Sequence, residues 1–206
     1  MIKFTKNNKF YAQTTYEFNL PAGYTCPYGK ECKICVNEKT GKFNKMGDRF
    51  RCYAASGERY PSVRKRRWEN YRSILNGELI ELPKDAKYVR IHASGDFFSQ
   101  EYFDKWLVVC RENPQITFWA FTKSLPFWLN RIKEIPENLH LQASYGGYKD
   151  YLIKENRLKY AKVFMTTKEA KASGLPIDTD DKYAMSGKQS FALVDRYEKR
   201  KKKKDG

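Results

Sequence analysis

The sequence lacks a hydrophobic run of the roughly 18 apolar residues that a membrane-spanning helix needs. Its first eight residues are polar and basic, without the apolar stretch of a signal peptide. We therefore expect a cytoplasmic protein with no membrane partner. No repeat with a period of roughly 20–50 residues is visible, which excludes solenoids and propellers.

Acidic residues are scarce relative to basic ones. The 206 residues include 24 Asp and Glu against 40 Lys and Arg, which gives a net charge of +16. We expect residues 199–206 to form a basic disordered tail and residues 1–198 to form a single (β/α) domain. Because the domain keeps a positive balance without the tail, the charge favours a nucleotide or nucleic-acid substrate.

Cysteines are few, and the cytosol keeps most cysteines reduced. Four of the five lie in the irregular segment 26–60, at Cys26, Cys32, Cys35 and Cys52. Thiolates gathered in this way are typical of a zinc ion or an iron–sulfur cluster. Only Cys32 and Cys35 have the close spacing usual in zinc sites, so the spacing leaves both metals open. Cys110 falls on the apolar face of a predicted helix and is interpreted as a core residue.

Strands and helices alternate from residue 61 onward. Pro61 suits the first turn of a helix that ends before the stop signal Asn76-Gly77. A second helix is predicted from Gln100 to Asn113, with Ser99 as its N-cap, and a third follows Ser124 and ends at Ile135. The predicted strands lie at 10–18, 88–93, 116–121, 139–143 and 163–166.

This alternation predicts an α/β fold with a mostly parallel sheet and right-handed crossovers. A closed eight-unit barrel typically needs about 250 residues, which is more than this chain has. We therefore expect a partial (β/α) barrel of mostly parallel strands with an irregular Cys-rich N-terminal segment. An open doubly wound sheet is the alternative.

Polar side chains gather where the predicted strands end. Ser94-Gly95-Asp96 follows one strand, Thr122 and Lys123 belong to the end of the next, and Ser144 follows the one after that. Parallel strands present their carboxyl ends at one edge, where α/β proteins bind ligands. The sequence therefore predicts a ligand site at this edge of the sheet.

Three basic side chains are candidates for substrate contact or proton transfer, namely His92, Lys123 and His140. Arg64 lies in the first turn of a predicted helix, where a cation opposes the helix dipole. That placement indicates a contact with a cofactor carboxylate or a phosphate, with a solvated helix face as the alternative.

The residues also carry a resemblance to a known family. Its motifs are the Cys26-Pro27 pair, Cys32, the run Cys52-Tyr53-Ala54, Arg64, Arg67 and Trp68, the strand endings 89–97 and 121–124, and the late segment 187–192. With these motifs the chain resembles an uncharacterised family of phage- and plasmid-encoded proteins. That family in turn resembles the radical S-adenosylmethionine (SAM) enzymes.

The resemblance implies a cofactor and a set of site residues. In radical SAM enzymes three cysteines bind a [4Fe–4S] cluster and leave one iron open to the amino and carboxylate groups of SAM. The resemblance implies Cys26, Cys32 and Cys52 as ligands, with Cys26, Cys32 and Cys35 as the alternative set. It also implies that Ser94-Gly95-Asp96 receives the amino group, while Thr122 and Ser144 line the ribose or substrate side.

The resemblance implies an iron–sulfur enzyme that takes an electron from a donor protein. It would generate a 5′-deoxyadenosyl radical to modify an anionic substrate such as a nucleotide or nucleic acid. The alternative from another class is a non-catalytic, zinc-stapled nucleic-acid-binding protein that uses Cys26, Cys32, Cys35 and Cys52 as ligands. A third hypothesis is a SAM- or nucleotide-binding protein whose cluster is only structural.

Overall fold

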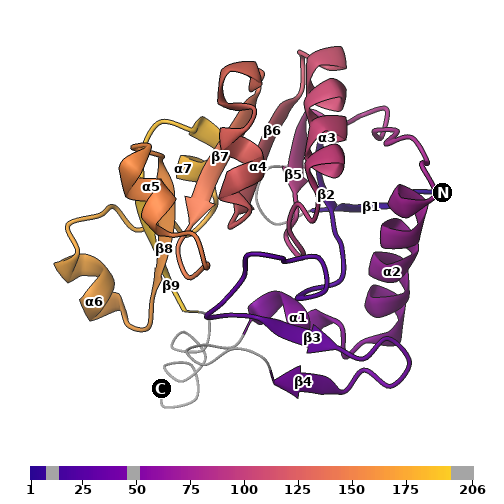
Figure 1. Ribbon diagram of the computed structural model, residues 1–206, viewed down its shortest axis with the longest axis horizontal. Coiled ribbons are helices and arrows are strands. Elements are labelled where there is room, and N and C mark those ends of the chain that lie inside the picture. The colour runs from indigo at the N-terminus through magenta and orange to yellow at the C-terminus, as the bar shows by residue number, and fades with distance from the viewer. Residues whose placement is uncertain (8–13, 46–51, 196–206) are drawn as a thin grey trace.

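The computed structural model describes residues 1–7, 14–45 and 52–195 and shows a mixed α/β protein (Figure 1). The predicted basic tail 199–206 and residues 10–13 of the predicted first strand lie outside the described residues. Within the described ranges, no helix combines the length and the apolar character needed to cross a membrane.

A seven-stranded, mostly parallel sheet forms the centre of the protein. Its order is β1 (Phe4–Lys6), β2 (Thr15–Phe18), β5 (Tyr88–Ile91), β6 (Thr117–Thr122), β7 (Leu139–Ser144), β8 (Tyr160–Phe164) and β9 (Phe191–Val194). The edge strand β1 runs antiparallel to β2, and the other neighbours are parallel. The strands follow one another in sequence order without the reversal of a doubly wound sheet. The described residues form no closed barrel.

Helices connect the parallel strands. They are α1 (Tyr53–Gly57), α2 (Pro61–Leu75), α3 (Gln100–Glu112), α4 (Leu125–Leu129), α5 (Tyr151–Glu155), α6 (Thr167–Ala172) and α7 (Lys182–Ser186), with a 3-10 turn η2 (Ile132–Glu134). A two-stranded antiparallel sheet, β3 (Ile34–Val36) and β4 (Phe43–Lys45), lies in the long first crossover between β2 and β5.

The two faces of the sheet are covered differently. Trp106 and Leu107 of α3 belong to the main core together with the β6 residues Phe118 and Ala120. Trp119 points to the opposite face and packs in a smaller cluster with residues of α7. Because side chains alternate along a strand, one face of β6 packs in the main core and the other in the cluster with α7.

Several sequence predictions are confirmed. Helix α2 begins at Pro61, and α3 begins at Gln100 with the Ser99 hydroxyl accepting a hydrogen bond from the Tyr102 N–H at 3.1 Å. Such a cap satisfies an otherwise unpaired N–H of the first turn. Cys110 is fully buried in the main core, as its place on the apolar face of α3 predicts.

Other predictions are wrong in detail. The helix expected to reach Ile135 ends at Leu129 and continues only as the turn η2. Its expected cap, Ser124, instead donates its hydroxyl proton to the Phe97 carbonyl at 2.6 Å. Strand β9 and the β3–β4 sheet were not predicted, because short strands without regular alternation carry little periodic signal.

Candidate metal and ligand site

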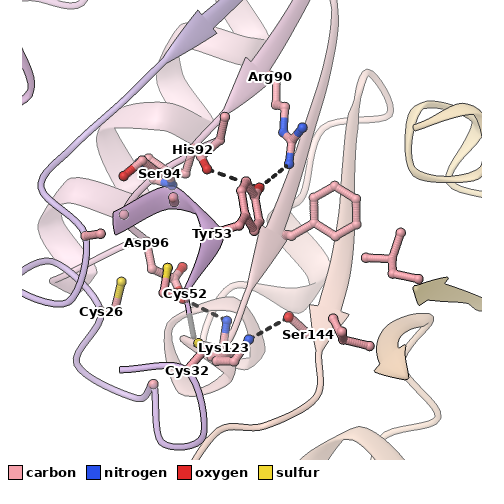
Figure 2. A pocket seen from close by; sticks show the side chains of 18 of the residues that line it. Cys26, Cys32, Cys52, Tyr53, Arg90, His92, Ser94, Asp96, Lys123 and Ser144 are labelled. Carbon is pink, nitrogen blue, oxygen red and sulfur yellow. Dashed lines mark hydrogen bonds between the residues drawn. The ribbon is translucent and has the colours of Figure 1, made fainter. Parts of the chain in front are cut away.

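A cavity of about 210 Å³ lies at the carboxyl edge of the parallel sheet. Its walls come from the ends of β5, β6 and β7, from β8 and β9, and from the Cys-rich first crossover (Figure 2). Of the residues predicted for the site, those that line it are Cys26, Cys32, Cys52, His92, Ser94, Gly95, Asp96, Lys123 and Ser144. The predicted location of a ligand site therefore coincides with a real cavity.

Three thiols open onto this cavity. Cys26, Cys32 and Cys52 all line it (Figure 2). Cys32 lies near enough to the other two thiols to raise the pKa of both Cys26 and Cys52, and Cys52 raises the pKa of Cys26. Cys35 is absent from the lining because it lies on β3, where its sulfur is buried against the backbone of Gly23. The structure thus separates Cys35 from the other three thiols of the segment.

Burial raises the pKa of the thiols at Cys26 and Cys52, and the neighbouring Asp96 raises the pKa of Cys26 further. Backbone amides at Ala54 and Ala55 lower the pKa of Cys52, but by less than burial raises it. Without a metal these groups are therefore neutral thiols near pH 7. A bound metal ion deprotonates a coordinating thiol, so the thiol no longer favours its neutral form.

The three thiols that line the cavity do not form a close-set site for one metal ion. Across the described part of the chain, no three His, Cys, Asp or Glu side chains converge closely enough to hold one metal ion. Ligands of one zinc lie about 2.3 Å from it and nearly touch each other. An iron–sulfur cluster is larger, so its ligand sulfurs stand further apart. Cys26, Cys32 and Cys52 share one cavity, and which group they could hold is taken up under the proposed function.

Ser94 and Gly95 pack the Cys-rich segment onto the end of β5. The Ser94 hydroxyl donates to the Leu20 carbonyl at 2.9 Å, and the Leu20 N–H donates to the Ser94 carbonyl at 2.9 Å. Gly95 has φ +88°, and a Cβ there would lie 2.7 Å from the Leu20 Cβ and 2.6 Å from the Thr25 Oγ1. A glycine is therefore required for close packing at this position.

A second attachment joins the Cys-rich segment to the loop after β7. The N–H groups of Lys30 and Glu31 both donate to the Gly146 carbonyl, at 3.1 and 3.0 Å. The Asp150 carboxylate accepts from the N–H groups of Gly146 and Gly147, which fixes that loop. The segment carrying Cys26 and Cys32 is thus held from both sides of the cavity.

Arg64 lies outside the cavity, which corrects the expectation of a cofactor contact. Its guanidinium is buried and donates to the carbonyls of Glu38 at 2.7 Å and Glu58 at 2.6 Å. The cation in the first turn of α2 therefore satisfies backbone carbonyls of the first crossover. Beside it, the fully buried Glu58 carboxylate accepts from the N–H of Ala22 at 2.7 Å and from Arg67 at 3.0 Å.

Asp96 is a buried carboxylate that accepts three hydrogen bonds. Its partners are the Thr122 hydroxyl at 2.6 Å, the Phe97 N–H at 2.8 Å and the Lys123 N–H at 2.8 Å. Burial raises the pKa of Asp96 to about 6, against the effect of these bonds. Thr122 is fully buried and absent from the cavity lining, so it orients Asp96 instead of facing a ligand.

Lys123 brings a cation to the thiol end of the cavity. Its ammonium donates to the Ser144 hydroxyl at 2.6 Å and lies near enough to Cys52 to lower the pKa of that thiol (Figure 2). An ammonium has three N–H donors, and Ser144 takes one of them. Lys123 and Ser144 therefore form a polar pair beside the sulfurs, at the ends of neighbouring strands.

The two histidines differ in position. His92 lines the cavity with an unusual φ of +67°, and its Nε2 lies 2.8 Å from the Tyr102 hydroxyl. Burial lowers the pKa of His92 to about 3. His140 lies outside the cavity, where its Nδ1 hydrogen bonds to the Met185 carbonyl of α7, so the expectation of a substrate contact is corrected. Its ring packs beneath Gly187.

The sequence analysis assigned no role to the residues at the far end of the cavity. Arg90 is buried there, with its guanidinium 2.8 Å from the Asp181 carboxylate and 3.2 Å from the Tyr53 hydroxyl (Figure 2). Burial lowers the pKa of Arg90, but the neighbouring Tyr53, Asp181 and Glu17 raise it by more, so it stays charged. An arginine inside a parallel strand was the available signal, because such strands are normally apolar.

Comparisons with known proteins place this chain in a phage protein family. The family model for Gene product 88 matches residues 2–206. A Gene 88 protein of Mycobacterium phage L5 is 36% identical over 117 residues, covering 49% of this chain and 44% of that protein. A Gene 88 protein of Mycobacterium phage D29 is 32% identical over 117 residues, covering 49% and 43%. The matched region thus spans less than half of these curated relatives. No solved structure matches.

These findings overturn the resemblance to radical SAM enzymes and confirm only its phage part, because the matched family is Gene product 88. The resemblance depended on the Ser94-Gly95-Asp96 motif, and the contacts of this motif explain why it misled. Ser94 and Gly95 pack against the Leu20–Thr25 turn, and Asp96 is bonded to Thr122, so the motif has a structural use. Because the family model matches nearly the whole chain, this protein belongs to the Gene product 88 family.

Proposed function

We propose that this protein is a cytoplasmic iron–sulfur enzyme, in which Cys26, Cys32 and Cys52 bind a [4Fe–4S] cluster at the edge of a partial (β/α) barrel. One observation carries the proposal: these three thiols line one cavity while Cys35 is turned away from it. Three protein ligands leave one iron of a four-iron cluster without a thiolate. The proposal rests on the chemistry of the site and not on kinship with radical SAM enzymes.

The polar groups beside the sulfurs suit a ligand with amino and carboxylate groups. Lys123 retains N–H donors for a carboxylate. Asp96 has about four acceptor positions, of which three are filled, so it offers one to an amino group. We propose S-adenosylmethionine as this ligand. A reduced cluster would supply the electron that breaks its carbon–sulfur bond, and a donor protein would reduce the cluster.

The chain's own residues bind the ligand, orient it and keep water from it. Tyr53 stands between the thiol end and Arg90, with its hydroxyl donating to the Ala93 carbonyl at 3.2 Å (Figure 2). Phe121, Val163 and Leu193 add apolar side chains to the cavity lining. An apolar cavity with a few fixed polar groups is typical of a small-molecule site. Arg90 and the positive net charge favour an anionic substrate such as a nucleotide or nucleic acid.

The geometry argues against the zinc-stapled alternative. A four-cysteine zinc site needs Cys35 beside the other three thiols, but Cys35 is buried against Gly23 on β3. That alternative therefore requires the β3–β4 sheet to move.

Metal analysis of protein purified without oxygen tests the proposal. We expect a brown protein with about four irons per chain. Cys26→Ser, Cys32→Ser and Cys52→Ser should each lose the iron, while Cys35→Ser, the matched control from the same segment, should keep it. A colourless protein with one zinc, or iron that depends on Cys35 and not on Cys52, would contradict the proposal.

The ligand is tested separately by incubating the reduced protein with S-adenosylmethionine. We expect 5′-deoxyadenosine to form with the native protein and not with Cys52→Ser. An iron-loaded, reduced protein that forms none, with or without added nucleic acid, would overturn the ligand assignment while leaving the cluster in place.

A further inference from the structure

We propose that a surface beside the cavity mouth binds single-stranded nucleic acid, and that this strand is the substrate class of the site. The surface consists of Lys30, Tyr148, Lys149, Tyr151 and Lys154 and is called the rim patch. The inference rests on the proposed function for its chemistry, but its binding step stands on observations of its own.

The rim patch borders the cavity through backbone contacts. Gly29 lines the cavity and forms a β-bridge with Gly147, and the Tyr148 N–H donates to the Tyr28 carbonyl at 3.0 Å. Lys30 follows Gly29 directly, and its own N–H donates to Gly146 at 3.1 Å. These bonds place the loop after β7 against the cysteine segment. A ligand bound to this loop therefore lies next to the cavity opening.

Two tyrosines of the patch are exposed to solvent. Tyr148 is 57% exposed and Tyr151 is 54% exposed. The Lys149 ammonium lies 5.8 Å from the centre of the Tyr151 ring, within range of a cation–π contact. Exposed aromatic rings with adjacent cations are the features on which proteins stack unpaired bases while holding the phosphates.

The charge around these rings is positive. Lys154 lies three residues after Tyr151 on α5, so the two side chains share a helix face. Residues 148–159 contain four cations and two acids. One of the acids, Asp150, is occupied by two backbone N–H groups of its own loop. Residues 148–159 therefore carry a net charge of +2, and the Glu31 carboxylate lies beside Gly146 at the edge of the patch. The positive excess suits a phosphate backbone.

A single strand fits the patch better than a duplex. Stacking on Tyr148 and Tyr151 needs bases whose faces are free, and paired bases are already stacked on their neighbours. The tyrosines are also sequence-tolerant platforms, because every base has a π-face. We therefore expect binding with little sequence preference.

Fluorescence anisotropy with a short fluorescein-labelled oligothymidylate tests the inference on the full chain. The double variant Tyr148→Ala/Tyr151→Ala should bind the strand at least about tenfold more weakly. Tyr60→Ala is the matched control, because Tyr60 is 68% exposed and lies beside the start of α2, far from α5 (Figure 1). The double variant Lys149→Gln/Lys154→Gln should reduce the slope of log affinity against log salt concentration. The reduction should match the loss of about two phosphate contacts.

Three results would each overturn the inference. The first is unchanged affinity in the double tyrosine variant, and the second is equal affinity for an oligothymidylate and a duplex of the same length. Replacing Lys201 to Lys204 with glutamine separates the tail from the patch, and complete loss of binding in that variant would also overturn it. Strand binding is measured by anisotropy without S-adenosylmethionine or reductant, whereas the cluster is measured by iron content. Failure of the cluster therefore remains distinguishable from failure of the patch.

Discussion

The parallel sheet and the Cys-rich first crossover are held together by different forces. The sheet with α3 is stabilised by buried apolar side chains, among them the fully buried Phe18, Phe103 and Trp106. The crossover has a much smaller apolar cluster around Val36 and Ala55. Buried polar groups hold it instead, above all the Glu58 carboxylate bonded to the Ala22 N–H and to Arg67.

This difference separates stability from site assembly. Apolar burial is non-directional and supplies most of the free energy of folding. Hydrogen bonds and close glycine contacts are directional, so they determine where the sulfurs lie. Damage to the core should therefore lower the free energy of unfolding without moving the thiols, whereas damage to the attachments of the crossover should do both.

The largest effect is expected from Trp106→Ala. Trp106 is fully buried and packs edge-on against Phe18, with ring centroids 5.4 Å apart. Its loss should lower the free energy of unfolding by about 3–5 kcal/mol, measured by urea denaturation. Val108→Ala on the same helix, 47% exposed, should change it by less than about 0.5 kcal/mol.

The same comparison predicts that the fraction of Trp106→Ala protein that folds keeps its iron content. A loss of iron in the folded fraction, with stability little changed, would contradict the separation of the two regions.

An intermediate effect is expected from Gly95→Ala, because Gly95 packs the first crossover against the end of the sheet. The left-handed φ of +88° and the clashes with Leu20 and Thr25 should together cost about 3 kcal/mol. The turn carrying Cys26 should also shift, so iron binding should fall. Gly77→Ala is the matched control, because its φ is +79° and nothing lies within 4 Å of the added methyl group.

Gly77→Ala should therefore cost only about 1 kcal/mol and leave iron binding unchanged. Equal losses of stability in the two alanine variants would show that close packing at Gly95 contributes nothing.

The smallest effect concerns His92, at the border of sheet and cavity. Its folded-state pKa of about 3 lies below the unfolded value of about 6.5. The unfolded state therefore takes up the proton first, so the contribution of the neutral imidazole is present above pH 6.5 and is lost as the pH falls towards 3. Between pH 7 and pH 5.5 the native protein should lose about 1 kcal/mol through this residue.

His92→Asn removes the titration and tolerates the positive φ. Urea denaturation of metal-free protein should show the native chain losing about 1 kcal/mol more than the variant between pH 7 and pH 5.5. An equal loss of unfolding free energy in both proteins would show that His92 is accessible to protons in the folded state.

Most of the regular framework could be predicted from sequence. Pro61 and Ser99 marked the starts of α2 and α3 because local signals determine helix ends. The clustering of polar site residues at the carboxyl edge of the sheet followed from the strand endings at Asp96 and Lys123. Arg64 and His140 were misplaced, because their partners are backbone carbonyls remote in sequence, such as Glu38 and Met185.

The order of apolar and polar residues by itself determined an α/β chain with parallel strands and one polar edge, because periodicity and caps are local properties. Folding in three dimensions decided which thiols meet. Cys35 is only three residues from Cys32, yet β3 buries its sulfur behind Gly23, while Cys52 comes from beyond the β3–β4 sheet to line the cavity. Such proximity depends on packing and hydrogen bonds between distant segments, and spacing along the chain does not contain it.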